Sequence, residues 1–437
     1  MKEKEANSKE KAGDIVKIRT SSESYEGTII ESYDPKIILL KLKSGYNIGI
    51  EKKDVKKMVK VGEAEKKGFP EAEIKEKEKV KKPGVSLIVT GGTISSRLDY
   101  ATGGVKWLMN PKEIFAMAPK VNDIVKINKI EKPFMMASEN MSSENWKQIA
   151  KTAEKLLNDD ENKGIIITHG TDTLHYTAAA LSFMLKNLNK PVILTYAQRS
   201  TDRGSTDTSL NLTCAASAAI SDIAEVMLVG HASENDDFCY AIRGTKARKM
   251  HSSRRDTFRP INDLPIAKIS EEGKIEIMDK FSEIRKRNDK KVVADTNFEE
   301  MVALIKFYPG AKPDIIEFLI KQKYKGVVIE ATGLGHVATE ESKNNWLPAI
   351  KKAIDNGMII CITTQTLYGR VDPYVYAPGR KLLDAGVLFL EDMLPETAYI
   401  KLGWVLGHAK GEEAKKLMMQ NIAGEFNPKI SQKTFLF

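Results

Sequence analysis

The sequence predicts an α/β protein, in which a small N-terminal β-barrel is followed by a two-domain body with parallel α/β sheets. Three observations lead to this prediction. Residues 14–62 contain short runs rich in β-branched residues. Residues 84–277 alternate apolar runs with segments of helical period, as parallel sheets covered by helices do. Residues 301–437 contain a second, smaller set of the same kind.

Length and composition are those of a soluble protein with more than one domain. The 437 residues exceed one ordinary domain, and 42% of them are hydrophobic and 29% charged. No run approaches about 20 apolar residues, so no membrane span is expected. Residues 1–13 form a charged tail without the apolar core of a secretory signal, so a cytoplasmic location is expected.

Neither the cysteines nor the histidines have the spacing of a metal site. Cys214, Cys239 and Cys361 are far apart and are expected to be buried thiols in a reducing compartment. The six histidines show no HExxH-like spacing, so no metal ion is expected. The net charge of +9 permits contact with nucleic acid, although alternating Lys and Glu, as in residues 75–79, more simply describe a solvated surface.

The barrel is predicted from strand-like runs separated by turn-forming Ser, Asp, Pro and Gly. The four clearest runs are Asp14–Arg19, Tyr25–Ile30, Ile37–Leu42 and Tyr46–Ile50. Four or five strands in about fifty residues suggest an SH3- or Sm-like barrel, a module that usually binds partners. Residues 63–83, mostly Glu and Lys, are predicted to be a solvated linker.

The body is predicted from buried strands and the helices between them. Its first domain has the apolar runs Val85–Val89, Gly164–Ile167, Pro191–Leu194 and Glu225–Val229. Ser142 and Ser143 can cap a helix over Glu144–Leu157, and Asn110 with Pro111 can begin another before residues 112–117. Residues 278–300 are polar and basic and form the connector. The second domain has strand-like Val302–Lys306, Gly326–Ile329 and Met358–Ile362, and helix-like Pro313–Gln322, Trp346–Ile354, Pro395–Leu406 and Glu412–Ile422.

Two threonine-containing motifs follow buried strands. Thr90–Thr93 has the sequence TGGT, whose glycines allow a sharp turn and close approach of a ligand to main-chain N–H groups. His169–Thr173 has the sequence HGTDT and follows another strand. Ligands of α/β sheets bind at the carboxyl ends of the strands, where both motifs lie. Alone, TGGT can be an ordinary strand-to-loop turn and Asp172 a helix cap, but two such loops at equivalent points are harder to explain in this way.

A threonine hydroxyl is a poor nucleophile at neutral pH and needs a nearby base. Lysine can serve as this base when burial lowers its pKa or when a carboxylate partner aligns its side chain. The basic segment 243–258 offers several candidates, and spacing alone does not choose among them.

Together, TGGT and HGTDT resemble the paired signatures of the L-asparaginase family, and the resemblance extends over residues 84–437. In that family a lysine precedes a phenylalanine by nine residues, as Lys249 precedes Phe258, whereas Lys246 does not match. The resemblance implies an asparaginase-like body in which Thr93 forms an acyl-enzyme. It also implies that Thr171, Asp172 and Lys249 form a proton relay.

The same resemblance implies a set of substrate-binding residues. Tyr100 resembles the tyrosine of the mobile lid, although the lid is shorter than in free asparaginases. Ser138 and Glu139 match positions that hold the α-groups of the amino-acid substrate. Glu139 and Asp172 would pair with its α-ammonium group.

Several features differ from those of free asparaginases. Ala197–Arg203 is more charged, and His336 stands where bacterial asparaginases often carry Asn. With Gln365–Val371 and the appended barrel, these features resemble the D subunits of archaeal glutamyl-tRNA(Gln) amidotransferases. That resemblance implies a glutaminase component, which releases ammonia from glutamine for a partner E subunit that converts Glu-tRNA(Gln) to Gln-tRNA(Gln).

The resemblance further implies a homodimer within a D2E2 complex. This chain would need no cofactor, and ATP and Mg would be used by the partner, since no Walker-type loop occurs here. A free cytoplasmic asparaginase or glutaminase is the alternative. A non-catalytic binding protein on the same scaffold is a third interpretation, which the complete set of catalytic side chains disfavours.

Overall fold

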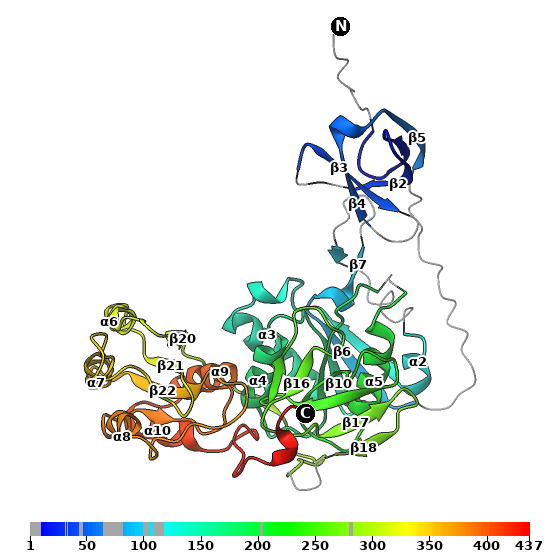
Figure 1. Ribbon diagram of the computed structural model, residues 1–437. Coiled ribbons are helices and arrows are strands. Elements are labelled where there is room, and N and C mark those ends of the chain that lie inside the picture. Colours follow the sequence, from blue (N-terminus) through cyan, green and yellow to red (C-terminus); the bar gives the residue numbers. More distant parts are fainter. Residues whose placement is uncertain are drawn as a thin grey trace.

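The computed structural model describes residues 10–30, 32, 34–42, 47–63, 82–98, 105–107, 118–201, 204–278 and 283–437. These residues form an N-terminal barrel, a large N-terminal α/β unit and a smaller C-terminal α/β unit, drawn from blue through green to red in Figure 1. The small barrel and the two-unit α/β body are as the sequence predicts. No helix in the described ranges is long and apolar enough to cross a membrane.

The barrel is an antiparallel sheet of five strands in the order β4-β3-β2-β1-β5. Alternate side chains such as Val16, Ile18 and Leu40 are fully buried in its core, which explains the mixed apolar and polar pattern of the runs. The strands are β1 (Asp14–Arg19), β2 (Ser24–Ile30), β3 (Ile37–Leu42), β4 (Asn47–Glu51) and β5 (Lys57–Glu63).

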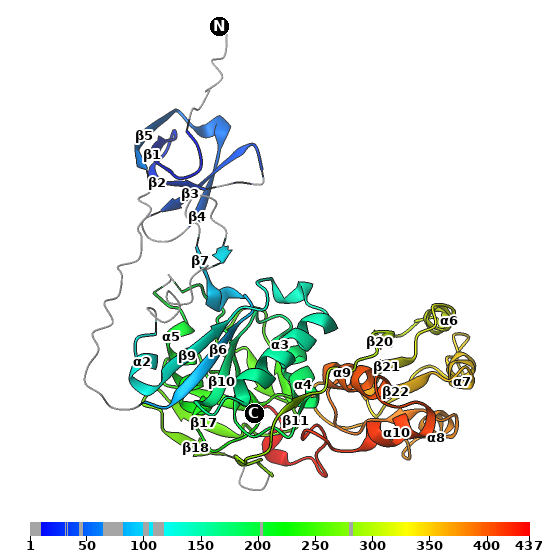
Figure 2. The ribbon, with the colours of Figure 1, turned by 180° about the vertical axis from the view of Figure 1, so that it is seen from behind.

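The large unit is built on an eight-stranded sheet in the order β18-β17-β14-β13-β12-β10-β6-β9. Five neighbouring strands are parallel, and three of them, β9, β6 and β10, are labelled in the view from behind in Figure 2. They are β9 (Lys126–Glu131), β6 (Gly84–Val89), β10 (Asn162–Thr168), β12 (Val192–Thr195) and β13 (Val226–His231). The central strands are mostly apolar because both faces of the sheet are buried in the two clusters of the core.

The other edge of this sheet is antiparallel, so the sheet is mixed rather than wholly parallel. β14 (Phe238–Arg243), β17 (Ala267–Ser270) and β18 (Ile275–Ile277) pair antiparallel with their neighbours. The connection from β13 to β14 contains only residues 232–237, too few for the crossover that parallel pairing requires.

Helices of the large unit pack on the two faces of the sheet. They are α2 (Val121–Ile124), α3 (Ser143–Leu157), α4 (Leu174–Met184) and α5 (Thr208–Ala219). The predicted start of α3 is confirmed, because Ser142 caps it in a capping box with Asn145. The helix predicted over residues 112–117 lies outside the described residues.

The C-terminal unit is a parallel sheet in the order β20-β21-β22-β23 with helices around it. Its strands are β20 (Val302–Lys306), β21 (Gly326–Ala331), β22 (Ile359–Thr364) and β23 (Leu388–Phe389). Its helices are α6 (Asp314–Lys321), α7 (Leu347–Asp355), α8 (Ala377–Asp384), α9 (Pro395–Leu406) and α10 (Gly411–Met419).

One apolar core joins the two units. Helix α9 lies beside α4 at their junction in both views, and Trp404 of α9 stacks on Phe183 of α4 with ring centroids 6.1 Å apart. The connector is also fastened to the large unit, since Arg285 donates two hydrogen bonds to Glu225 Oε2, at 3.1 and 2.8 Å. The two units are therefore joined both by apolar packing between α9 and α4 and through the connector.

Short elements complete the fold. The two-stranded sheets are β7 (Ser96–Leu98) with β8 (Val105–Trp107), β11 (Leu185–Lys186) with β19 (Val293–Ala294), and β15 (Ala247–Lys249) with β16 (Phe258–Pro260). The 3-10 turns are η1 (Lys52–Asp54), η2 (Thr93–Ser95), η3 (Ser138–Asn140) and η4 (Gln432–Thr434).

Candidate active site

The two threonine motifs leave adjacent strands at the same edge of the sheet. β6 and β10 are parallel, and Val89 is in register with Thr168. Thr90 donates its N–H and its hydroxyl to the carbonyl oxygen of Thr168, at 3.2 and 2.8 Å. The TGGT and HGTDT loops therefore begin side by side, as the sequence predicts for the carboxyl ends of parallel strands.

Glycine at position 92 allows the two loops to touch. Its φ is +84°, and a Cβ on it would lie only 2.4 Å from the backbone nitrogen of Gly170. Gly170 in turn leaves room for Ser138, since a Cβ on it would lie 2.8 Å from Ser138 Oγ. Three chain segments thus converge within backbone contact distance, next to Thr93.

Thr93 opens the 3-10 turn η2 and is partly exposed. The hydroxyl of Ser96 stabilises the turn by donating to the carbonyl oxygen of Thr93 at 2.8 Å. Thr201 Oγ1 donates to the carbonyl oxygen of Ser96, also at 2.8 Å. The Thr93 side chain therefore sits on a braced turn rather than on a free loop.

Lys249 contacts both Thr171 and Asp172. Its Nζ donates to Thr171 Oγ1 at 2.9 Å and to Asp172 Oδ1 at 2.7 Å. Thr171 is buried, and only 11% of the Lys249 side chain is exposed. The structure thus brings together three of the four residues expected to act in catalysis, and it places Thr93 on the adjoining turn.

The strand pairing explains the nine-residue offset between Lys249 and Phe258. The two residues are direct partners across the β15–β16 hairpin. Phe258 is buried, and its ring lies 4.8 Å from that of Tyr196 and 6.2 Å from that of His175. The aromatic ring therefore supports the strand that presents the lysine.

Lys246 occupies a different environment. Its Nζ lies 2.7 Å from Asp392 Oδ2 of the C-terminal unit, and both side chains are 0% exposed. It makes a structural ion pair between the units instead of facing Thr171. Sequence spacing alone does not distinguish the two lysines. In the structure they differ in their hydrogen-bond partners, which are Asp392 for Lys246 and Thr171 for Lys249.

The expected substrate-binding residues are placed in part. Ser138, in η3, accepts a hydrogen bond from the Thr173 N–H at 3.3 Å, and the Thr173 hydroxyl donates to the Ser138 carbonyl at 2.7 Å. Glu139 is exposed next to it. Tyr100 lies outside the described residues.

His169 holds the HGTDT loop. Its Nδ1–H donates to the carbonyl oxygen of Gly170 at 2.7 Å, so its Nε2 accepts from the Thr177 hydroxyl at 2.8 Å. Burial lowers the pKa of His169 to about 4. The ring is therefore neutral near pH 7 and acts as a hydrogen-bonded support.

His175, in the first turn of α4, is a buried histidine near Lys249 that sequence reasoning did not single out. Burial, then the charges of Arg248 and Lys249, lower its pKa to about 3, and its Nδ1 has no hydrogen-bond partner among the described residues. Its position two residues beyond the HGTDT motif is the one signal that could have singled it out.

Two features depart from free asparaginases: the segment Ala197–Arg203, of which residues 202 and 203 lie outside the described residues, and His336. The backbone N–H groups of Gln198 and Arg199 donate to the buried carboxylate of Asp207 at 2.9 to 3.1 Å. His336 ends a turn after β21 in the C-terminal unit, and Thr332 donates to its carbonyl. In the described part of the chain, no hydrogen bond joins His336 to Thr171 or Lys249.

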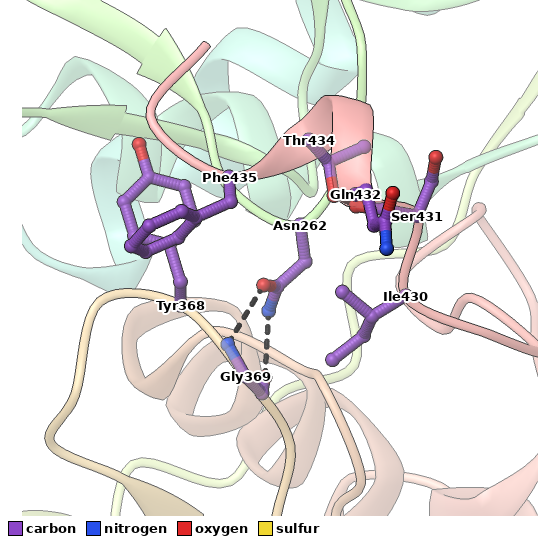
Figure 3. A pocket seen from close by; sticks show the side chains of 8 residues that line it. All are labelled: Asn262, Tyr368, Gly369, Ile430, Ser431, Gln432, Thr434 and Phe435. Atoms are coloured by element: carbon purple, nitrogen blue, oxygen red, sulfur yellow. Dashed lines mark hydrogen bonds between the residues drawn. The ribbon is translucent and has the colours of Figure 1, made fainter.

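A cavity of about 380 Å³ lies away from these residues, where the two units meet the C-terminal segment. Figure 3 shows Asn262 bridging to Gly369 at its base, with Tyr368 and Phe435 on one side. Its lining comprises Asn262, Tyr368, Gly369, Ile430, Ser431, Gln432, Thr434 and Phe435. No residue of the candidate active site belongs to it.

Comparisons with known families cover most of the chain. Residues 84–282 match the family "Asparaginase, N-terminal", and residues 301–419 match "Glutaminase/Asparaginase C-terminal domain". Residues 11–61 match "GatD N-terminal domain".

Full-length relatives are named as the D subunit of glutamyl-tRNA(Gln) amidotransferase. The one from Thermococcus kodakarensis is 48% identical over 435 residues, covering 97% of this chain and 96% of its own length. The one from Pyrococcus furiosus is 48% identical over 430 residues, with 97% and 95% covered. The one from Methanothermobacter thermautotrophicus is 42% identical, with 96% and 94% covered.

Solved asparaginases share the fold of the body. The thermostable L-asparaginase from Thermococcus kodakarensis superposes with a TM-score of 0.70 at 30% identity, over 79% of this chain and 100% of its own. L-asparaginase I from Vibrio cholerae gives a TM-score of 0.68 at 28% identity, over 79% and 99%. With full-length relatives and family matches in agreement, the chain belongs to the family of glutamyl-tRNA(Gln) amidotransferase D subunits, whose body has the asparaginase fold.

Proposed function

We propose that this chain is the glutaminase component of a tRNA-dependent amidotransferase. It hydrolyses glutamine to glutamate and ammonia, and a partner E subunit uses the ammonia to convert Glu-tRNA(Gln) to Gln-tRNA(Gln). The observation that carries the proposal is the contact of Lys249 with Thr171 and Asp172 beside the Thr93 turn, in a chain similar over its full length to amidotransferase D subunits.

The chemistry is acyl transfer in two steps. Thr93 Oγ attacks the side-chain amide carbon of glutamine, and its proton passes to the Thr171–Lys249 pair. Protonation of the amide nitrogen releases ammonia and leaves a γ-glutamyl ester on Thr93. Water, deprotonated through the same pair, then hydrolyses the ester. The contact between the Gly92 and Gly170 backbones supports this arrangement, because it holds the two loops together.

Groups around the site bind the oxyanion of the reaction and the α-ammonium group of the substrate. Backbone N–H groups of the two loops supply hydrogen bonds to the oxyanion. Asp172 and Glu139 pair with the α-ammonium group, and Ser138 lies beside them. Asp172 thereby acts on the substrate as well as on Lys249.

The partner E subunit activates the carboxylate of the tRNA-bound glutamate. ATP and Mg belong to the E subunit, this chain needs no cofactor, and tRNA is engaged through the complex. The complex is a D2E2 heterotetramer in the cytoplasm. Molar mass from light scattering of the co-purified proteins tests the stoichiometry, and a mass other than that of two copies of each refutes it.

The decisive experiment measures ammonia release from glutamine and from asparagine, with and without the purified E subunit and Glu-tRNA(Gln). The proposal expects glutamine hydrolysis that rises when partner and tRNA are added. Rapid hydrolysis of asparagine by the chain alone, unaffected by the partner, would establish the free asparaginase instead.

A further inference from the structure

Two basic side chains lie close to Lys249 in the chain, Arg248 in β15 and Lys246 in the turn just before it, and both reach the C-terminal unit. Lys246 Nζ lies 2.7 Å from Asp392 Oδ2. Arg248 Nη2 lies 3.3 Å from Glu396 Oε1, and its Nη1 lies 3.4 Å from Oε2. Glu396 is in the first turn of α9, four residues after Asp392. Two neighbouring ion pairs therefore join this segment to the start of α9.

Strand geometry links these pairs to the direction of Lys249. Successive side chains of an extended strand point to opposite sides. Lys246 continues the hairpin ladder, because its carbonyl accepts the Ile261 N–H at 3.0 Å. Lys246 and Arg248 thus share the side facing the C-terminal unit, while Lys249 lies on the other side, where it meets Thr171.

Hydrogen bonds fix the positions of the two carboxylate residues, Asp392 and Glu396, that contact these basic side chains. Asp392 is fully buried, and its second oxygen accepts the Asn427 N–H at 2.9 Å. Thr397, next to Glu396, donates its hydroxyl to the carbonyl of Thr245 at 2.8 Å. The guanidinium of Arg248 meets both carboxylate oxygens of Glu396, an arrangement that restricts direction as well as distance.

We propose that the C-terminal unit positions the relay lysine: Asp392 and Glu396 grip Lys246 and Arg248, and strand alternation then turns Lys249 onto Thr171 and Asp172. The inference rests on the proposed function in taking Lys249 as the base. Arg248 and Glu396 are positioning residues, because they act on the reaction only through Lys249. A displacement of about 1 Å at a reacting group can lower a rate by roughly 100-fold, so a small shift of β15 would matter.

The test uses Arg248→Met, which keeps an unbranched, largely apolar stem and removes the charged guanidinium group, in the full chain assembled with its partner. The kcat for ammonia release from glutamine should fall by roughly 10- to 100-fold. KM should change little, because no substrate contact is lost. Arg248→Lys should recover part of the rate. A crystal structure of Arg248→Met should show Lys249 Nζ beyond hydrogen-bond distance of Thr171 Oγ1.

Lys352→Met is the matched control. It removes an ion pair with Glu317, at 2.6 Å between α7 and α6, far along the chain from β15. Neither kcat nor the Lys249 position should change in it. If Arg248→Met does not fold, Glu396→Gln breaks the same ion pair and keeps nearly the same side-chain shape. The same two measurements apply to it: kcat for ammonia release and the position of Lys249 in a crystal structure.

The outcomes separate the inference from the proposed function. An unmoved Lys249 with an unchanged kcat overturns the inference. So does an unmoved Lys249 with losses of both kcat and thermal stability, which would make Arg248 a folding residue only. If the wild-type assembly releases no ammonia from glutamine but Lys249 moves in Arg248→Met crystals, the proposed function fails and the positioning inference stands.

Discussion

Lys249 and Asp172 form an ion pair whose two members differ in exposure. The Nζ–Oδ1 distance is 2.7 Å, but 64% of the Asp172 side chain is exposed, against 11% for Lys249. An ion pair this open to water contributes little to stability. Asp172 Oδ2 accepts no hydrogen bond within the described ranges, so this oxygen is available to a substrate while Oδ1 orients the lysine.

Thr93, Thr171, Asp172 and Lys249 should behave as one catalytic unit, because each depends on the others to move a single proton. Each single change, Thr93→Ala, Thr171→Ala, Asp172→Asn or Lys249→Met, should lower the glutaminase rate by about 10³-fold or more. Double changes should add little further loss. The measurement is kcat for ammonia release, and losses that multiply across pairs would show that the four act independently.

Lys246 and Lys249 should give opposite phenotypes. Lys249→Met should abolish ammonia release while leaving the melting temperature nearly unchanged, since the Asp172 carboxylate that loses its partner is exposed to water. Lys246→Met leaves the Asp392 carboxylate buried without its partner and should lower the unfolding free energy by about 3–5 kcal/mol. Denaturation in urea and activity assays at 25 °C check both. Lys246→Met together with Asp392→Leu should regain stability. A stable Lys246→Met that lacks activity while Lys249 Nζ stays within hydrogen-bond distance of Thr171 Oγ1 would move the relay role to Lys246.

Thr93→Ala should separate ammonia supply from ammonia use. The complex with this variant should fail to amidate Glu-tRNA(Gln) with glutamine, because no acyl-enzyme forms. It should amidate with ammonium supplied at high concentration, since the partner's site is untouched. The readout is Gln-tRNA(Gln) formed with either nitrogen donor, alongside gel filtration to verify assembly. Failure with ammonium in an intact complex would mean that Thr93 does more than release ammonia.

Gly92→Ala should damage both the fold and the site. Its φ of +84° disfavours a side chain, and the added Cβ would lie 2.4 Å from the Gly170 nitrogen. Stability should fall by about 1–3 kcal/mol, and ammonia release should fall more than stability alone explains, because the two loops separate. Gly204→Ala is the matched control, since a Cβ there meets nothing within 4 Å. Equal effects of the two substitutions would contradict the close packing of the loops.

The buried His169 should make stability depend on pH. Its pKa falls from 6.5 to about 4 in the folded chain because burial disfavours the charged ring. The unfolded chain therefore takes up a proton below pH 6.5 that the folded chain resists. Stability is complete above pH 6.5 and decreases by about 3 kcal/mol as the pH falls to 4. The urea concentration at the unfolding midpoint, measured between pH 7 and 4, should decrease less steeply with falling pH in His169→Gln than in the wild type. Identical slopes would exclude a contribution of His169 to the pH dependence.

Much of the architecture follows from local patterns in the sequence. Helix α9 begins at Pro395 and ends at Leu406, as predicted, because proline favours the first helical turn and no further proline interrupts the segment. Helix α10 ends at Met419, three residues before the predicted end. There the Ile422 and Ala423 N–H groups bond to the Glu425 carboxylate instead of continuing the helix.

What the sequence by itself determined was the placement of TGGT and HGTDT at strand ends, since strand runs and glycine turns are local and have few alternatives. The choice between Lys246 and Lys249 was decided by tertiary structure, apart from the family resemblance. Both are lysines in one basic segment, and their intrinsic properties are the same. Only the fold brings Asp392 to one and Asp172 to the other, from 146 residues later and 77 residues earlier in the chain. Strand alternation then turns the two ammonium groups to opposite sides of β15, so one joins the two units and the other reaches Thr171.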